Sequence, residues 1–195
     1  LQADRRRCRE ALGIAEGELV LLVSGGSQGA RRLNEAVIGA LPRLLDCAHV
    51  IHLTGTLEHE GVARQAAEQV GKSPRYRCLA FSDRPWELAA AADLALTRGG
   101  ASSLAELAVL GVPMIIVPYP GAAAHQKQNA APLVEAGAAV LVDNEKLTSD
   151  LLALQVAEMA QQSEKLRAMA EAARRWSRPR AADTIAELLV TLAQS

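Results

Sequence analysis

The residues best suited to chemistry are small and polar, and they lie in three stretches that each follow an apolar run. The stretches are GGSQGA at 25–30, RGGASSLAE at 98–106 and PYPGAAAHQKQNA at 118–130. Glycines let the backbone turn tightly and approach a ligand, and a helix that begins there offers unpaired N–H groups to phosphate. Two glycine-led helix starts on one parallel sheet predict a site for a nucleotide diphosphate.

Polar side chains in the second and third stretches suit the sugars of such a ligand. Glu106 can accept hydrogen bonds from ribose hydroxyls, and the four polar residues at 125–128 suit a sugar with many hydroxyls. The spacing of Ser103 and Glu106 is also that of a capping box, which would give both residues a purely structural role. The sequence leaves both interpretations of this pair open.

The first stretch also fits G-x-S-x-G, the nucleophile elbow of α/β-hydrolases, with Ser27 as the nucleophile. Asp93 or Asp143 and His125 would then be its partners. A hydrolase of that type needs several strands and an oxyanion loop before the elbow, whereas here the elbow follows the first predicted strand. A serine hydrolase is therefore the alternative hypothesis, and a nucleotide-binding module without catalysis is a third.

No pattern for a metal centre accompanies these stretches. The sequence has no paired-aspartate D-x-D element, and His49, His52 and His59 are scattered, with His52 expected to be structural. A diphosphate bound here would therefore rely on amide groups and helix dipoles, with no metal cofactor. Three cysteines without metal-ligand spacing are expected to be reduced thiols: Cys8, Cys47 and Cys78.

Charge and hydropathy exclude two further classes of function. The formal net charge of the 195 residues is −1, which argues against a dedicated nucleic-acid partner. No apolar run approaches the ~18–20 residues that a membrane-spanning helix needs, so no transmembrane segment is expected.

Six apolar runs of strand length alternate with helical patterns along most of the chain. The predicted strands span 19–24, 50–54, 76–80, 93–97, 113–118 and 138–142. The predicted helices between them span 31–45, 57–70, 86–91, 103–110 and 124–136. Because the runs are apolar on both faces, they predict an α/β fold with a doubly wound, parallel, six-stranded Rossmann-like sheet. The three stretches would then meet at its carboxyl edge.

Beyond residue 142 the pattern is helical only. Helices are predicted over 149–160 and 164–176, and a last one after Pro179 ends near 193. This last helix carries an apolar stripe, so it either closes the sheet or packs on a second domain. A basic cluster, Arg5 to Arg9, is interpreted as a solvated helix face. We expect one domain over residues 1–195.

Two long segments carry a resemblance to a known family. GGSQGARRLNEAV and RGGASSLAELAVLGVPMIIVPYPGAAAHQKQNAAPLVEAGAAVLV resemble the donor-binding C-terminal domain of the GT-B glycosyltransferases of family 28. The resemblance spans residues 19–142. It is to members that move N-acetylglucosamine from UDP-N-acetylglucosamine (UDP-GlcNAc) to lipid I, forming lipid II in peptidoglycan synthesis. It implies a second, N-terminal acceptor domain that is absent from this chain, which begins with Leu1 rather than Met.

The resemblance implies roles for individual residues. Ser27 would contact the donor near its diphosphate, and Ser82, directly after Phe81, would stand where the uracil edge is read. Glu106 would bind the ribose hydroxyls, and Gln126 the hydroxyls of N-acetylglucosamine. The implied donor-binding set is Ser27, Ser82, Ala101, Ser102, Ser103, Leu104, Ala105, Glu106 and Gln126, with Gly26, Gln28, Gly100 and His125 as weaker candidates.

The implied mechanism is a single inverting displacement in which UDP leaves without a metal. The general base would lie in the absent domain, so no catalytic residue is assigned here. That domain would also contact the lipid-linked acceptor, as a peripheral protein on the cytoplasmic face of the bacterial membrane. One departure concerns an arginine that the family has near the phosphates. Its position falls near Gln2, so the arginine is either replaced or supplied from the Arg5–Arg9 cluster.

Overall fold

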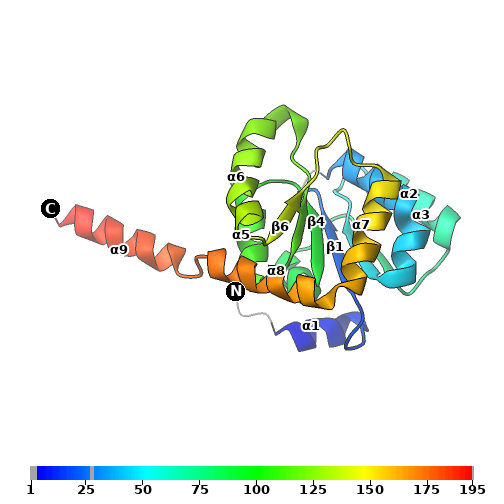
Figure 1. The fold of residues 1–195 in the computed structure, drawn as a ribbon, viewed down its shortest axis with the longest axis horizontal. Helices are drawn as coiled ribbons and strands as arrows, with labels where there is room; N and C mark the ends of the chain where they lie inside the picture. The colour runs from blue at the N-terminus through cyan, green and yellow to red at the C-terminus, as the bar shows by residue number, and fades with distance from the viewer. Residues whose placement is uncertain (1–3, 27–28, 195) are drawn as a thin grey trace.

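Six parallel strands form one sheet at the centre of the molecule, in the order β3-β2-β1-β4-β5-β6 (Figure 1). The structure, a computed structural model, describes residues 4–26 and 29–194. The strands are β1 (Val20–Ser24), β2 (His49–Leu53), β3 (Tyr76–Leu79), β4 (Leu94–Thr97), β5 (Met114–Ile116) and β6 (Ala139–Leu141). The predicted doubly wound α/β fold is therefore confirmed.

Helices connect the strands and continue after the last of them. They are α1 (Arg5–Leu12), α2 (Arg31–Cys47), α3 (His59–Val70), α4 (Pro85–Ala91), α5 (Ala101–Leu110), α6 (Ala123–Glu135), α7 (Ser149–Gln161), α8 (Ser163–Trp176) and α9 (Ala181–Ala193), with a short 3-10 helix, η1 (Pro120–Ala122), before α6. Each predicted strand and helix is present, with its ends shifted by at most two residues.

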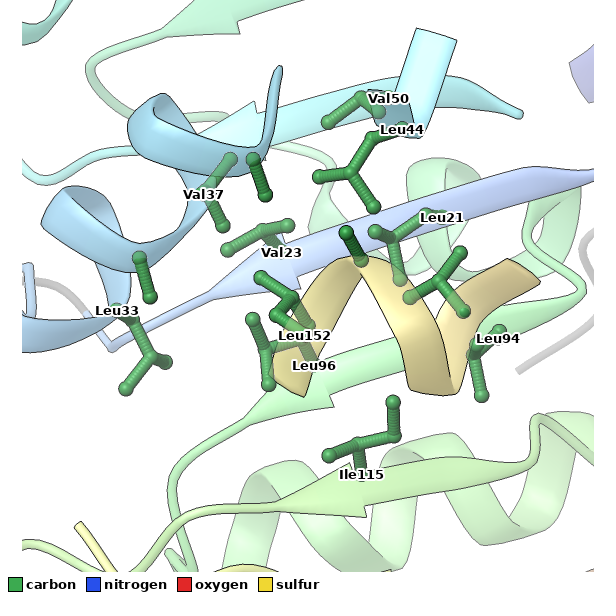
Figure 2. Close-up of a cluster of buried hydrophobic side chains, with 14 of the residues drawn as sticks. Leu21, Val23, Leu33, Val37, Leu44, Val50, Leu94, Leu96, Ile115 and Leu152 are labelled. Carbon is green, nitrogen blue, oxygen red and sulfur yellow. The ribbon is translucent and has the colours of Figure 1, made fainter. Parts of the chain in front are cut away.

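The sheet is buried on both faces because alternate side chains of each strand enter different cores. On one face Leu21 and Val23 of β1 pack with residues of α2 and α7, including Val37 and Leu152 (Figure 2). On the other face Leu22 joins the cluster formed with α4, α5 and α6. Helix α8 contributes side chains to both clusters. This packing fixes the loops at the carboxyl ends of the strands.

The basic residues of α1 hold the amino-terminal edge of the sheet. Arg9 is 7% exposed, and its guanidinium donates to Asp93 and to the carbonyl of Ala91 at 3.1 Å each. Arg5 also pairs with Asp93, which accepts from the Val20 amide at 2.9 Å. The prediction of a solvated face is therefore wrong for Arg9, whereas Arg5 is exposed although it pairs with Asp93. Nor can these two side chains serve the phosphates, because they lie at the edge of the sheet opposite the glycine-led loops.

The last helix, α9, extends away from the body of the molecule (Figure 1). None of its residues is buried, and Ile185, Leu188, Leu189 and Val190 are each more than half exposed. The interpretation that the last helix closes the sheet is therefore wrong.

Candidate functional site

A pocket of about 180 Å³ lies at the carboxyl edge of the sheet, where the strand order reverses. Strand β1 pairs with both β2 and β4, so the loops that follow β1 and β4 diverge and leave a crevice, the usual ligand site of open α/β sheets. The pocket is lined by Leu22, Ser24, Gly26, Leu53, Ala80, Phe81, Ser82, Pro85, Ala89, Ala95, Thr97, Ser103, Glu106 and Leu107.

Four of the residues singled out from the sequence meet in this pocket. Gly26 follows β1, Ser82 lies between β3 and α4, and Ser103 and Glu106 are on α5. The Ser82 hydroxyl accepts from the Arg84 amide at 3.2 Å, which fixes its loop, while the Glu106 side chain is exposed at the pocket wall. The pocket thus combines an apolar interior with a carboxylate and hydroxyls at its rim.

The capping box predicted at Ser103 and Glu106 is wrong. Helix α5 begins at Ala101 with Gly100 as its N-cap, so Ser103 is the third helical residue and caps nothing. Helix α2 likewise begins without a side-chain cap, because Ala30 is its N-cap residue. The first-turn amides of both helices therefore have no capping side chain, and they remain available to an anion at the same edge of the sheet.

The remaining candidates on α5 lie outside the pocket. Ala101, Ser102 and Ala105 are exposed, whereas Leu104 is 1% exposed and packs in the core. A contact of Leu104 with a ligand would therefore need its backbone.

The glycine loop after β1 is folded tightly against β2. A Cβ atom on Gly29, whose φ is +80°, would stand 2.2 Å from the carbonyl oxygen of Thr54, so only glycine fits. The Gly29 amide donates to the Gly26 carbonyl at 3.0 Å. Gly26 itself has a φ of +91° and open space where a Cβ would lie. Ser27 and Gln28, predicted to contact the donor, lie outside the described residues.

Gln126 joins the second and third loops rather than lining the pocket. Its Oε1 accepts from the Gly99 amide at 3.0 Å and from the Tyr119 amide at 2.8 Å. Asn129 donates to the Gly99 carbonyl at 3.0 Å. Within the part of the chain that the structure describes, the Gln126 Nε2 group has no protein partner, so it can still donate to a ligand. His125, next to it, is exposed.

Arg98 is a buried residue at this edge that the sequence did not single out. Its Nη1 donates to the Val117 carbonyl at 2.9 Å and to Asn144 at 2.8 Å, and the guanidinium lies 5.8 Å from the ring centroid of Tyr119. Burial lowers the pKa of Arg98. The side chain therefore ties together the loops that follow β4, β5 and β6. Its place directly after a strand was the only signal in the sequence.

The arrangement does not assemble the hydrolase triad. Asp93 lies before β4 and is held by Arg5 and Arg9 at the opposite edge of the sheet. Asp143 is paired with Lys127 at 2.8 Å, which holds the pKa of Asp143 below its usual range. No hydrogen bond joins either carboxylate to His125 within residues 4–26 and 29–194.

A wider groove of about 1390 Å³ lies between α1 and α8 at the amino ends of the strands. Because charged groups of both signs line it and the glycine-led helix starts lie at the other edge, we take the smaller pocket as the candidate site.

The described residues contain neither a cluster of metal-ligating side chains nor a membrane-spanning helix. No group of three or more His, Cys, Asp or Glu side chains in this part of the chain could hold a metal ion. No helix within it is long and apolar enough to span a bilayer. The three cysteines are free thiols, as expected.

Comparison with known proteins identifies the family. Residues 20–188 match the glycosyltransferase family 28 C-terminal domain. The chain belongs to this family. Family 28 membership and the pocket geometry together favour the glycosyltransferase interpretation over the hydrolase, and the sheet is the Rossmann-like half of a GT-B fold.

Individual relatives of this family 28 chain are MurG enzymes. UDP-N-acetylglucosamine–N-acetylmuramyl-(pentapeptide) pyrophosphoryl-undecaprenol N-acetylglucosamine transferase of Chlorobaculum tepidum is 40% identical over 98% of this chain and 52% of its own length. The protein of the same name from Moorella thermoacetica is 38% identical over 100% and 54%. The crystal structure of Acinetobacter baumannii MurG, 30% identical, superposes with a TM-score of 0.79 over 96% of this chain and 53% of that one. The chain thus spans about half the length of its curated relatives.

Proposed function

We propose that the chain binds UDP-GlcNAc as the donor half of an inverting transferase that glycosylates lipid I to form lipid II. The observation that carries the proposal is the pocket at the strand-order reversal, where Gly26, Ser82, Ser103 and Glu106 meet. Family 28 membership and the names of the relatives support this choice of donor and acceptor.

The size of the pocket supports a division of the donor among the loops. At about 180 Å³ it is smaller than the roughly 300–1,000 Å³ of a site that encloses a whole ligand. We therefore assign the pocket to the uracil, with Ser82 at the edge of the base and Glu106 on the ribose hydroxyls. The diphosphate would lie over the start of α5, near residues 101–105, and against the glycine loop with Ser27.

Gln126 would bind the N-acetylglucosamine through its Nε2 group, because Oε1 is occupied by the Gly99 and Tyr119 amides. His125 lies beside it. In this assignment Gln126 both orients the sugar and keeps the loops after β4 and β5 together.

The chain would orient the donor and stabilise the leaving group. An acceptor hydroxyl would attack the anomeric carbon, the bond to the diphosphate oxygen would break, and UDP would depart with inversion. Uncapped amides at the starts of α2 and α5 would stabilise the charge that develops on the diphosphate. The general base would come from an acceptor domain outside this chain.

The exposed apolar face of α9 supports that second domain. Half-exposed Ile185, Leu188 and Leu189 on one projecting helix are a surface that a partner domain would cover. We assign contact with lipid I, and peripheral association with the cytoplasmic face of the membrane, to that domain.

Calorimetric titration of UDP and UDP-GlcNAc tests the donor assignment. Glu106→Ala should weaken both ligands about tenfold, because a charge-assisted hydrogen bond is lost. Gln126→Ala should weaken UDP-GlcNAc more than UDP, since only the former carries the sugar. The control is Glu68→Ala, which removes an exposed carboxylate on α3. Unchanged affinity in both Glu106→Ala and Gln126→Ala would reject the assignment.

A further inference from the structure

A buried chain of hydrogen bonds runs from β3 through β2 to α2. The Asn34 Nδ2 group donates to the Thr54 carbonyl at 3.0 Å, and Asn34 Oδ1 lies 2.9 Å from His52 Nε2. The other ring nitrogen, His52 Nδ1, lies 3.0 Å from the Tyr76 hydroxyl. Asn34 is 3% exposed and His52 is fully buried. The side chains therefore form one connected line that ends on a backbone carbonyl.

The donor and acceptor at each step follow from the first bond. Because the Asn34 amide nitrogen is committed to Thr54, its oxygen faces the ring, and His52 carries its proton on Nε2. Nδ1 then accepts from the Tyr76 hydroxyl. Burial lowers the pKa of His52 to about 3, so the ring is neutral at physiological pH. Every polar atom of this neutral ring thus has a partner.

The carbonyl group of Thr54, at the end of this hydrogen-bond chain, packs against Gly29 of the glycine loop. A Cβ on Gly29 would stand 2.2 Å from this oxygen, so the α-carbon of Gly29 lies directly against it. The Thr54 hydroxyl donates to the Leu79 carbonyl at 3.2 Å, which fixes the residue from the other side. Gly29 is bonded to Gly26, and Gly26 lines the pocket. A shift of Thr54 would therefore displace Gly29 and, through it, Gly26.

We propose that Asn34 and His52 are positioning residues that hold Gly29 and, through it, Gly26 in place for the diphosphate of the donor. This inference rests on the proposed function. Ser82, which is assigned to the edge of the uracil, and its neighbour Phe81 lie on a different loop, after β3. Loss of this buried chain of hydrogen bonds should therefore weaken the binding of a nucleoside diphosphate and leave the binding of the nucleoside unchanged.

NMR titration of UDP and of uridine separates this role from a purely structural one. Asn34→Ala and His52→Leu should weaken UDP about tenfold and uridine less than twofold, since about one buried hydrogen bond no longer orients the loop. His52→Gln, which keeps a donor toward Asn34, should restore UDP binding to within about threefold of the original chain. His49→Leu is the matched control, because His49 lies at the other end of the same strand and pairs with Glu18.

Each outcome of this experiment decides between the accounts. Equal loss of UDP and uridine in folded variants, or an unchanged ratio of the two affinities, would overturn the positioning role. If His52→Leu does not fold, Asn34→Ala and His52→Gln carry the same comparison. An unsubstituted chain that binds no UDP would overturn the proposed function instead, and the inference with it.

Discussion

His52 makes the stability of the fold depend on pH. Burial lowers the pKa of this ring from 6.5 to about 3, so between these values the unfolded chain binds more protons than the folded one. The free energy of unfolding should therefore fall as the pH falls through this range, by up to about 1.4 kcal/mol per pH unit from this group.

Comparison of the original chain with His52→Gln isolates this contribution. Glutamine does not titrate, so the stability advantage of the original chain should shrink by about 2 kcal/mol between pH 7 and pH 4.5. Urea unfolding at the two pH values measures it. An advantage that stays constant would contradict a neutral buried ring.

At the scale of elements, the junction between the β4–α5 loop and α6 requires glycine at position 99. A Cβ on Gly99 would stand 2.6 Å from the Gln126 carbonyl oxygen, whereas one on Gly100 would meet nothing within 4 Å. Gly99→Ala should therefore lower the free energy of unfolding by about 1–3 kcal/mol through overpacking. Gly100→Ala should change it little, because its φ of −72° suits alanine. Chemical denaturation measures both, and equal effects would contradict the described contact.

The ion pairs of Arg5 and Arg9 with Asp93, which join α1 to the amino-terminal edge of the sheet, give a second prediction at this scale. Arg9→Ala should lower the free energy of unfolding by about 3 kcal/mol, because the carbonyls of Ala15, Glu18 and Ala91 lose their guanidinium donor. Asp93 would also lose one of its two arginine partners. Arg6→Ala removes only an exposed pair with Glu10 and should leave the free energy of unfolding nearly unchanged. Neither change should alter UDP affinity. A large loss of UDP affinity in Arg9→Ala would show that the basic cluster serves the phosphates after all.

Local pattern predicted the elements well and their contacts poorly. Strands such as Leu94–Thr97 are visible as apolar runs because burial on both faces leaves no polar positions. Charge suggested exposure for Arg9, yet its partner Asp93 is distant in sequence and no local period reveals the pair. The capping role of Ser103 was wrong for a similar reason, because the helix starts three residues earlier than the spacing of Ser103 and Glu106 suggested. Gln126 was singled out for a ligand, and only the fold showed that its oxygen bridges two loops.

At the scale of the whole molecule, α9 places none of its described residues in the core of this chain. Leu188→Glu should leave the unfolding free energy and UDP affinity of the 195 residues unchanged, because the side chain is 58% exposed. In a longer protein with an acceptor domain, the same change should lower transfer to lipid I. Destabilisation of the 195-residue chain by this substitution would show that α9 packs on the body.

The 195 residues should bind the donor and transfer nothing by themselves. They hold the candidate pocket, whereas the acceptor and the general base are assigned to another domain. An assay with UDP-GlcNAc and lipid I measures this. Robust formation of lipid II by this chain alone would contradict the assignment of the general base to another domain.

A crystal structure of the chain with bound UDP-GlcNAc tests the central claim most directly. We expect the uracil in the pocket beside Phe81 and Ser82, the ribose hydroxyls on Glu106 and the diphosphate over the start of α5. The sugar should then lie within hydrogen-bond distance of Gln126. A sugar nucleotide bound instead in the groove between α1 and α8, with the pocket empty, would contradict the account.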